Sequence, residues 1–397
     1  MSSDLLAAAS AIQPDTVALR RALHRRPEVG LTLPRTQRRI LDAIADLPLK
    51  ITRGEAVTSV TGVLEGARPG PVVLLRGDMD ALPMREDTGL EFASEVPGAM
   101  HACGHDTHVA MLAGAARLLA DRRDELAGAV VFMFQPGEEG YAGAKTMIEE
   151  GVLTAAGRPV DSGYALHISS HWPSGVISVR PGPALASSDV LHITVTGRGG
   201  HGSNPSEALD PVPVAAGIVQ AIQTMVTRRV SVFDPTVVSI TQIIAGTADN
   251  VIPETAEMFG TMRALSESTR RLVQDELRRL VPAIAAAHGA TATMEFRAGY
   301  PVTVNDPGAA ELVHRTATGL LGADRTSWER DPLMGAEDWS YVLQQVPGAI
   351  AFLGGCPPGL DPAGAPANHS NRVVFDEEAM ITGVATYAAT ALSALTA

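Results

Sequence analysis

Four short motifs of the sequence contain side chains that commonly bind metal ions. They are HACGHD with Cys103 and His105, GEEG with Glu138 and Glu139, ALHI with His167, and NHSN with His369. A thiolate, a carboxylate and three imidazoles form a borderline-soft donor set that suits Zn²⁺ and its late first-row neighbours. These five donors are too many for one catalytic ion with an open position, but they suit two ions that share the thiolate.

The adjacent carboxylates of Glu138 and Glu139 can have two different roles. One can bind metal while the other faces the metal-bound water as a general base, which amide hydrolysis requires. Each motif alone also fits a plain structural explanation. A lone histidine is usually packed or capping, and two glutamates before glycine often begin a solvated helix. Their joint occurrence, each near the end of an apolar run, favours a functional site.

These motifs follow short apolar runs that are typical of buried parallel strands, at residues 71–77, 129–135, 162–168 and 348–355. Helical periodicity lies between them, notably at residues 107–123 and 142–153. Alternating strands and helices predict an α/β domain with a largely parallel sheet. Side chains beyond the carboxyl ends of such strands meet in one crevice, so we expect the donors to converge there.

The middle of the chain has a different pattern. Alternating runs and amphipathic helices in the order β-α-β-β-α-β predict a ferredoxin-like α+β unit. We therefore expect a catalytic domain at 1–186 and 299–397, with residues 187–298 inserted as a lid. Asp210 is the expected N-cap of the first inserted helix, and Pro282 predicts a kink or an early end in the second.

Composition narrows the functional classes. The 397 residues and 45% apolar content favour two globular domains. A net charge of −13 opposes nucleic acid and anionic membranes, and no apolar run approaches the ~18 residues of a membrane helix. The two cysteines are too few for a disulfide framework, and the N-terminal segment has Asp4 in place of a basic signal region. We expect a cytoplasmic protein in which Cys103 is a free thiol.

The chain resembles the amidohydrolase branch of the aminoacylase, dipeptidase and carboxypeptidase family, which includes hippurate hydrolases, N-acyl-L-amino acid amidohydrolases and auxin-conjugate hydrolases. The resemblance covers nearly the whole chain. It rests on HRRPEVG, RGDMDALP, HACGHD, QPGEEG, ALH, GRGGHGS, ADNVIPE, GTMRAL, MGAEDW and NHSNRVVFDEEAM.

The resemblance implies two divalent metal ions per subunit, Zn²⁺ or Mn²⁺, with Co²⁺ or Ni²⁺ as alternatives. It implies that Cys103 bridges them, that Glu139 and His369 bind one ion, and that His105 and His167 bind the other. Glu138 is then the general base, and Asp80 is a carboxylate that orients a ligand imidazole. Asp78 stands where the wider family has a metal-binding histidine, and we do not assign it as a ligand.

Four further residues acquire roles from the resemblance. His201, in the inserted domain, would stabilise the oxyanion in its own or a partner subunit's site. Asn250 would contact substrate, Arg263 would pair with the substrate carboxylate, and Gly335 would let the backbone approach the substrate. A turn histidine, a turn asparagine and an exposed strand arginine are the competing explanations for the first three. Glu337 and Asp338, beside Gly335, can equally begin a solvated helix.

The expected reaction is metal-dependent hydrolysis of the amide bond of N-acyl amino acids, with N-acetyl or N-benzoyl conjugates as small-molecule substrates. The inserted domain is also the expected homodimer surface. Two alternatives are a dipeptidase or aminopeptidase on the same scaffold, and a non-catalytic protein that binds N-acyl amino acids.

Overall fold

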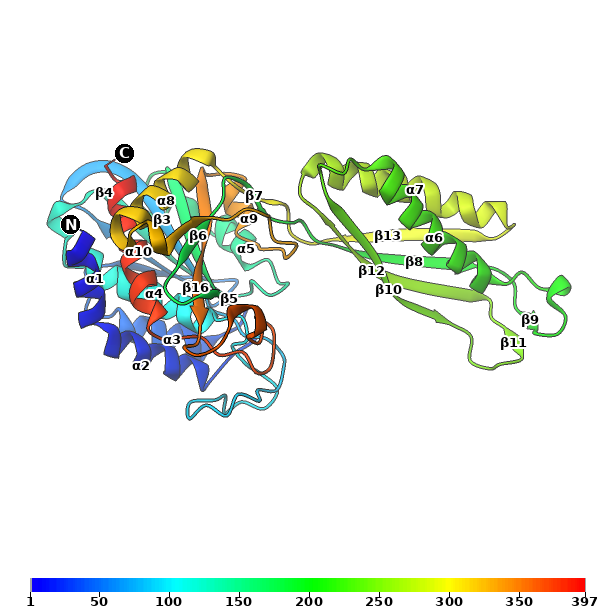
Figure 1. Ribbon diagram of the computed structural model, residues 1–397, viewed down its shortest axis with the longest axis horizontal. Helices are drawn as coiled ribbons and strands as arrows, with labels where there is room; N and C mark the ends of the chain where they lie inside the picture. The colour runs from blue at the N-terminus through cyan, green and yellow to red at the C-terminus, as the bar shows by residue number, and fades with distance from the viewer. Residues whose placement is uncertain (1, 397) are drawn as a thin grey trace. The chain divides into compact units, whose positions relative to one another are not determined.

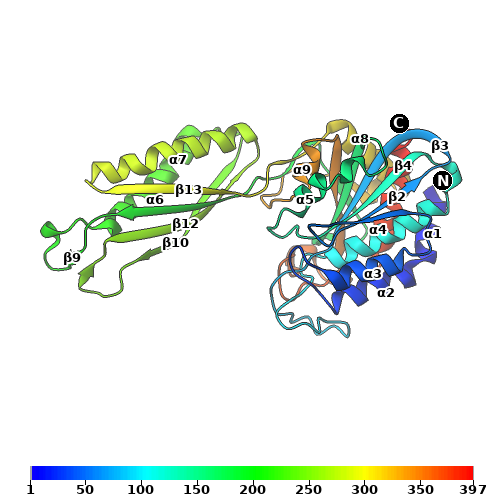
Figure 2. The same ribbon diagram turned by 180° about the vertical axis from the view of Figure 1, so that it is seen from behind.

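The computed structural model describes residues 2–396 and divides the chain into two compact units, shown in Figures 1 and 2. Unit 1 consists of Met1–Ala184, Val304–Asp331 and Asp338–Ala397. Unit 2 consists of Leu185–Thr303 and the short segment Pro332–Glu337. Unit 2 is therefore an insertion that also draws one later segment from the chain. Within the described residues, no helix is long and apolar enough to span a membrane.

The centre of unit 1 is an eight-stranded sheet. In spatial order its strands are β1 (Lys50–Arg53), β2 (Val60–Glu65), β4 (Ala127–Gln135), β3 (Arg68–Asp78), β5 (Ser162–Pro173), β16 (Gly348–Cys356), β6 (Ile177–Val179) and β15 (Thr326–Trp328). The four central strands, β4, β3, β5 and β16, are mutually parallel, and antiparallel pairs lie on both sides of them. This confirms the predicted largely parallel sheet.

Helices cover both faces of this sheet (Figures 1 and 2). One face of the sheet is covered by α4 (His105–Ala120), α8 (Pro307–Leu321) and α10 (Ala379–Ala394). Outside this layer lie α1 (Ser2–Ala11), α2 (Gln13–His24) and α3 (Pro34–Ala43). The opposite face of the sheet is covered by α5 (Gly143–Glu149) and α9 (Ser340–Leu343). Alternate strand residues such as Val73 and Leu75 face the first helical layer. A Cβ at Gly77 would lie 3.0 Å from the His108 carbonyl oxygen, so glycine permits the close approach of α4.

Strand β5 is longer than predicted. It continues to Pro173, so His167 lies within the strand and not at its end. The extension follows from pairing: β16 continues alongside it, with a register shift between Gly354 and Cys356. Local sequence pattern does not report such a partner, which explains the error of the sequence-based boundary.

Unit 2 has the predicted β-α-β-β-α-β order. Its elements are β8 (Asp189–Thr196), α6 (Pro211–Arg229), β10 (Thr236–Ala245), β12 (Thr255–Ala264), α7 (Glu267–Ala287) and β13 (Thr291–Ala298), with a two-stranded pair of β9 (Gly200–His201) and β11 (Val251–Ile252). The antiparallel sheet has the order β10-β12-β8-β13, and both helices cover one of its faces in Figure 1.

The ends of the two helices of unit 2 can be compared with the ends predicted from the sequence. The Asp210 carboxylate accepts a hydrogen bond from the main-chain N–H of Val212, which confirms the N-cap of α6. The predicted early end at Pro282 is wrong, because α7 continues to Ala287. The fully buried Val281 and Ala285 flank the proline, and their packing against the sheet stabilises the helix beyond it.

Candidate metal centre

Cys103 lies at the centre of the predicted ligand set. Its sulfur is 3.4 Å from Nε2 of His167 and 3.3 Å from Nε2 of His369. The His369 Nε2 atom is also 3.2 Å from Oε1 of Glu139, which in turn lies 4.0 Å from Nε2 of His105. Four separate segments of unit 1 thus bring five donor atoms to one place.

These donors form two groups that share one sulfur. The first contains Cys103, His105 and His167, and the second contains Cys103, Glu139 and His369; within each group the ligand atoms lie within 4.8 Å of one another. This grouping has the same division between two ions that the resemblance implies. It is the arrangement expected of two cations with a bridging thiolate.

Main-chain carbonyl groups set the orientation of two imidazoles. Nδ1 of His105 lies 2.8 Å from the carbonyl oxygen of Asp80, and Nδ1 of His167 lies 2.8 Å from that of Ile168. A carbonyl can only accept, so each Nδ1 carries a proton, and on the neutral ring each Nε2 then presents a lone pair. Ligand histidines of metalloproteins are commonly held in this way.

Two buried atoms of the cluster accept or donate no hydrogen bond among the described residues: Nε2 of His105 and Oε1 of Glu139. The first is 3.4 Å from Oδ2 of Asp78, and the second is 3.2 Å from Nε2 of His369. Buried polar atoms without a hydrogen bond are costly, and a cation between these donors would remove that cost. The local potential also favours positive charge. Burial, with the nearby Glu139 carboxylate, raises the pKa of the Cys103 thiol, while contacts with Cys103 and Glu139 raise the pKa of His369 to about 10. The residues therefore fit two divalent ions.

Asp80 fixes the backbone of the two adjacent glutamates. Its buried carboxylate accepts hydrogen bonds from the main-chain N–H groups of Glu138 at 2.9 Å and Glu139 at 3.0 Å. The same carboxylate is 3.5 Å from Nδ1 of His105, whereas the Asp80 carbonyl oxygen is at 2.8 Å. Asp80 thus contacts both halves of the site, with its side chain directed mainly to the glutamates and its main chain to the imidazole.

Glu138 lies beside the donor cluster. Its carboxylate is buried and lies within 4.8 Å of the ligand atoms of His105 and Glu139. Glu139 joins the group around Cys103 and His369, whereas Glu138 does not. The geometry therefore places Glu138 beside the donors of His105 and Glu139 but outside the group around Cys103 and His369.

His369 occupies a strained loop after β16. Its φ of 70° lies in the left-handed region, which is unusual for a residue with a Cβ. Its main-chain N–H donates to the carbonyl of Ala102 at 2.9 Å. The neighbouring Asn368 amide donates to the carbonyls of Cys103 at 3.1 Å and Ile168 at 3.0 Å. Asn368 thereby joins three ligand-bearing segments, a role that the sequence analysis did not assign; its place beside His369 was the only signal.

A buried ionic network lies next to the ligands. The Asp78 carboxylate accepts from Arg76 at 2.6 Å and from Nδ1 of His108 at 2.5 Å. Burial raises the pKa of Asp78, but Arg76 and the imidazoles of His105 and His108 outweigh it and hold the pKa well below its usual range. His108 Nε2 accepts from the N–H of Ile168 at 2.8 Å, so both ring nitrogens are engaged and His108 is not an available ligand.

The possibility that Glu337 and Asp338 begin a solvated helix is wrong, because both are buried. Asp338 pairs with Arg76 at 3.1 Å and accepts from the Gln135 amide at 2.8 Å. It also accepts from the N–H of Ala144 in α5. An arginine within an apolar strand was the available signal, since a buried cation requires a carboxylate partner.

The other predicted residues lie in unit 2. His201 is exposed, and its Nδ1 accepts from the N–H of Ser203 at 3.1 Å, which leaves Nε2–H as a free donor on the neutral ring. Asn250 is its neighbour, because the Asn250 carbonyl accepts from the N–H of Gly202 at 2.7 Å. Arg263, in β12, is half-buried and donates to Met262 O at 3.0 Å and to the hydroxyl of Thr261.

Gly335 belongs to the later segment of unit 2, and its carbonyl accepts from Ala186 N at 2.9 Å. A Cβ at this position would meet only Leu185 Cδ2, at 3.9 Å. The fold itself does not demand glycine here. The predicted role of Gly335, to let the substrate approach the backbone closely, therefore stays a prediction.

Comparison with known proteins adds independent observations. Residues 74–393 match the model of peptidase family M20/M25/M40. The chain is 41% identical to thermostable carboxypeptidase 1 of Saccharolobus solfataricus over 382 residues, which cover 94% of this chain and 93% of that protein. It is 37% identical to the N-acetylcysteine deacetylase of Bacillus subtilis, with 92% of each chain covered. The solved structure of a Bacillus subtilis protein described as a dinuclear metal-binding peptidase of the M20 family superimposes with a TM-score of 0.84, at 33% identity, covering 98% of this chain and 99% of that one.

Proposed function

The chain belongs to peptidase family M20/M25/M40, and on that premise we propose that it hydrolyses the amide bond of N-acyl amino acids with Glu138 as general base. The observation that carries this proposal is the convergence of Cys103, His105, Glu139, His167 and His369 beside the Glu138 carboxylate. The family acts on amides, and the site contains the donors and the base that such hydrolysis needs.

Two divalent ions, Zn²⁺ or Mn²⁺, would be held by these five donors, and when bound they would polarise the scissile carbonyl and acidify a water molecule. The other steps fall to the protein's own side chains. Glu138 accepts a proton from the attacking water and returns it to the departing nitrogen, so water is divided between the acid and the amine products. Asp80 holds the Glu138 main chain in place for this transfer.

We assign substrate and oxyanion contacts to unit 2. The Nε2–H of His201 is free to donate to the oxyanion, since Ser203 occupies its Nδ1. Asn250 lies beside it, and Arg263 supplies a guanidinium for the substrate carboxylate. We further propose that unit 2 forms a homodimer contact through strand β10, an edge strand with Ile243 and Ile244 exposed. Light scattering that gave a monomer mass would refute the dimer.

Substrate class follows from what the named relatives share. A C-terminal peptide bond and the amide of an N-acyl amino acid both join an acyl group to an amino acid with a free carboxylate. We therefore expect turnover of N-acetyl and N-benzoyl amino acids, and slower turnover of unblocked dipeptides. A dipeptidase would need a carboxylate for the free amine and would show the reverse order. Amine release by the metal-loaded protein, measured for both substrate sets, decides between them.

Two adjacent substitutions test the division of labour. Glu138→Gln should lower kcat by about 10²–10⁴-fold with both metals retained. Glu139→Gln should lower metal content and activity together, because it removes a ligand from the group around Cys103 and His369. Metal content by mass spectrometry and kcat for N-acyl substrates are the measurements. Loss of both metals in Glu138→Gln would refute the assignment of Glu138 as base.

A further inference from the structure

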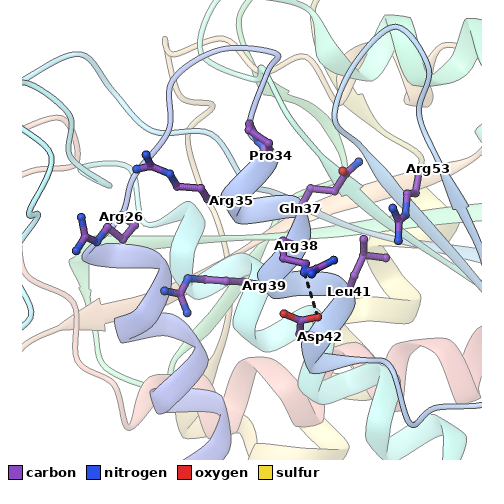
Figure 3. A pocket seen from close by; sticks show the side chains of 9 residues that line it. All are labelled: Arg26, Pro34, Arg35, Gln37, Arg38, Arg39, Leu41, Asp42 and Arg53. Carbon is purple, nitrogen blue, oxygen red and sulfur yellow. Dashed lines mark ion pairs between the residues drawn. The ribbon is translucent and has the colours of Figure 1, made fainter.

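Unit 1 contains a concave site, away from the metal centre, that the hydrolytic function does not use. It lies where the chain leaves α2, along α3 and at strand β1, and has a volume of about 660 Å³ (Figure 3). Its lining includes Arg26, Arg35, Arg38, Arg39 and Arg53, which we call the arginine pocket, and one carboxylate, Asp42. The charged side chains of the lining therefore sum to +4, in a chain whose net charge is −13.

Nearby carboxylates do little to neutralise this charge. Arg38 and Asp42 are 3.7 Å apart and mostly exposed, and Arg26 pairs with Glu95 outside the lining. Across residues 2–396, Arg35, Arg39 and Arg53 form no ion pair with a carboxylate. By contrast, Arg20 and Arg21 on the preceding helix both pair with Glu377. The pocket thus gathers three arginines that have no carboxylate partner within the described residues, whereas Arg20 and Arg21 on the preceding helix are paired.

The arrangement is unfavourable for α3 by itself. An exposed arginine face is ordinarily solvated and needs no explanation, but here Arg35 lies in the first helical turn, where no acidic residue balances the helix dipole. Arg35 and Arg39 are also separated by one helical turn, a spacing at which like charges destabilise a helix. Arg26 and Arg53 reach the same pocket from other elements, as Figure 3 shows. A bound anion would relieve these repulsions.

We propose that the arginine pocket binds a soluble molecule that carries adjacent phosphate groups. The planar guanidinium fork matches two phosphate oxygens, and arginines spread along α3 and across to β1, as Figure 3 shows, suit several phosphate groups better than one. The volume is within the ~300–1,000 Å³ range of small-molecule sites. Extended polyanions, such as a membrane surface, are disfavoured because they would also meet the strongly acidic remainder of the protein.

The test uses metal-loaded full-length protein and inorganic tripolyphosphate, titrated by calorimetry at low and high salt. The pocket variant is Arg35→Gln with Arg39→Gln. The matched control is Arg228→Gln with Arg271→Gln, which removes the same charge from exposed positions of unit 2. Tripolyphosphate can also withdraw catalytic metal, but it does so equally in all three proteins, so the difference between them reports the pocket. Circular dichroism and thermal unfolding check that both variants fold.

We expect tripolyphosphate to bind wild type and control alike, and the pocket variant to bind at least about tenfold more weakly. Binding should weaken with salt, because the arginines are exposed. Equal affinity in the pocket variant, or no binding to wild type, would overturn the proposal. Phosphatidylglycerol vesicles form a second arm: vesicle binding without tripolyphosphate binding would also overturn it, in favour of a membrane surface.

Discussion

Replacement of Asp80 by asparagine isolates the contribution of one buried carboxylate. The Asp80 oxygens accept the main-chain N–H groups of Glu138 at 2.9 Å and Glu139 at 3.0 Å. An amide of the same shape has one accepting oxygen and one NH₂ group, so one of these N–H groups must face another donor. The substitution leaves the Asp80 carbonyl, and with it the strongest contact to His105, unchanged.

The expected loss can be estimated from this geometry. A hydrogen bond to a charged group contributes about 1.5–3 kcal/mol. Since about 1.4 kcal/mol corresponds to a factor of ten in rate, displacement of the Glu138 backbone should lower kcat/KM by about 10- to 100-fold. The metal content should fall less, because the imidazoles of His105 and His167 keep their carbonyl partners and the altered group accepts a hydrogen bond from the main chain of one ligand, Glu139.

The assay is steady-state hydrolysis of an N-acyl amino acid at saturating metal, with metal content measured on the same samples. Asp124→Asn, an identical exchange at an exposed position, is the control. An unchanged kcat/KM in Asp80→Asn would refute the role of the carboxylate in placing Glu138. Complete metal loss would show instead that the carboxylate acts mainly through the proposed ligands Glu139 and His105.

Three further predictions concern single residues. Cys103→Ser should weaken both metal-binding events by more than about 100-fold, because one sulfur belongs to both donor groups; equilibrium dialysis that showed loss of only one ion would contradict this. Asn368→Ala should lower the free energy of unfolding by about 1–2 kcal/mol and reduce metal affinity, since two carbonyls lose their donor; Asn368→Asp, which cannot donate, should not restore either property in denaturation and metal titrations. His24→Gln should be more destabilising at pH 6 than at pH 9. Burial lowers the pKa of His24, but Asp106 and Glu86 outweigh burial and raise this pKa above 6.5 in the folded protein. The protonated imidazole therefore stabilises the fold fully below its pKa in the unfolded chain, and this stabilisation is lost as the pH rises through its pKa in the folded protein. Equal destabilisation at both values in thermal unfolding would show that the His24 charge is unimportant.

The sequence predicted those features that local pattern encodes. Apolar runs located the central strands, alternation located the inserted unit, and the donor motifs identified the residues that meet around Cys103. Features that depend on a distant partner were not accessible. The length of β5 depends on β16, and the burial of Asp338 depends on Arg76, which is 262 positions away in the chain.

The same limit applies to the contacts around the ligands. Asn368 in NHSN reads as a turn residue, and only the folded chain shows that its amide reaches the carbonyls of Cys103 and Ile168. His108 lies one helical turn from His105, and the sequence assigns it no role; the structure shows that both of its ring nitrogens are engaged. The arginine pocket likewise needs three elements to meet, so its arginines read in sequence as ordinary helix surface.

The left-handed backbone at His369 has an evolutionary consequence. Glycine or asparagine would adopt this conformation more easily, and a chain selected for thermal resistance alone would favour either of them there. The proposed ligand role of His369 accounts for an imidazole at a position where robustness alone would favour a different residue. Efforts to make the enzyme more heat-resistant should therefore leave this loop unaltered and seek their gains elsewhere.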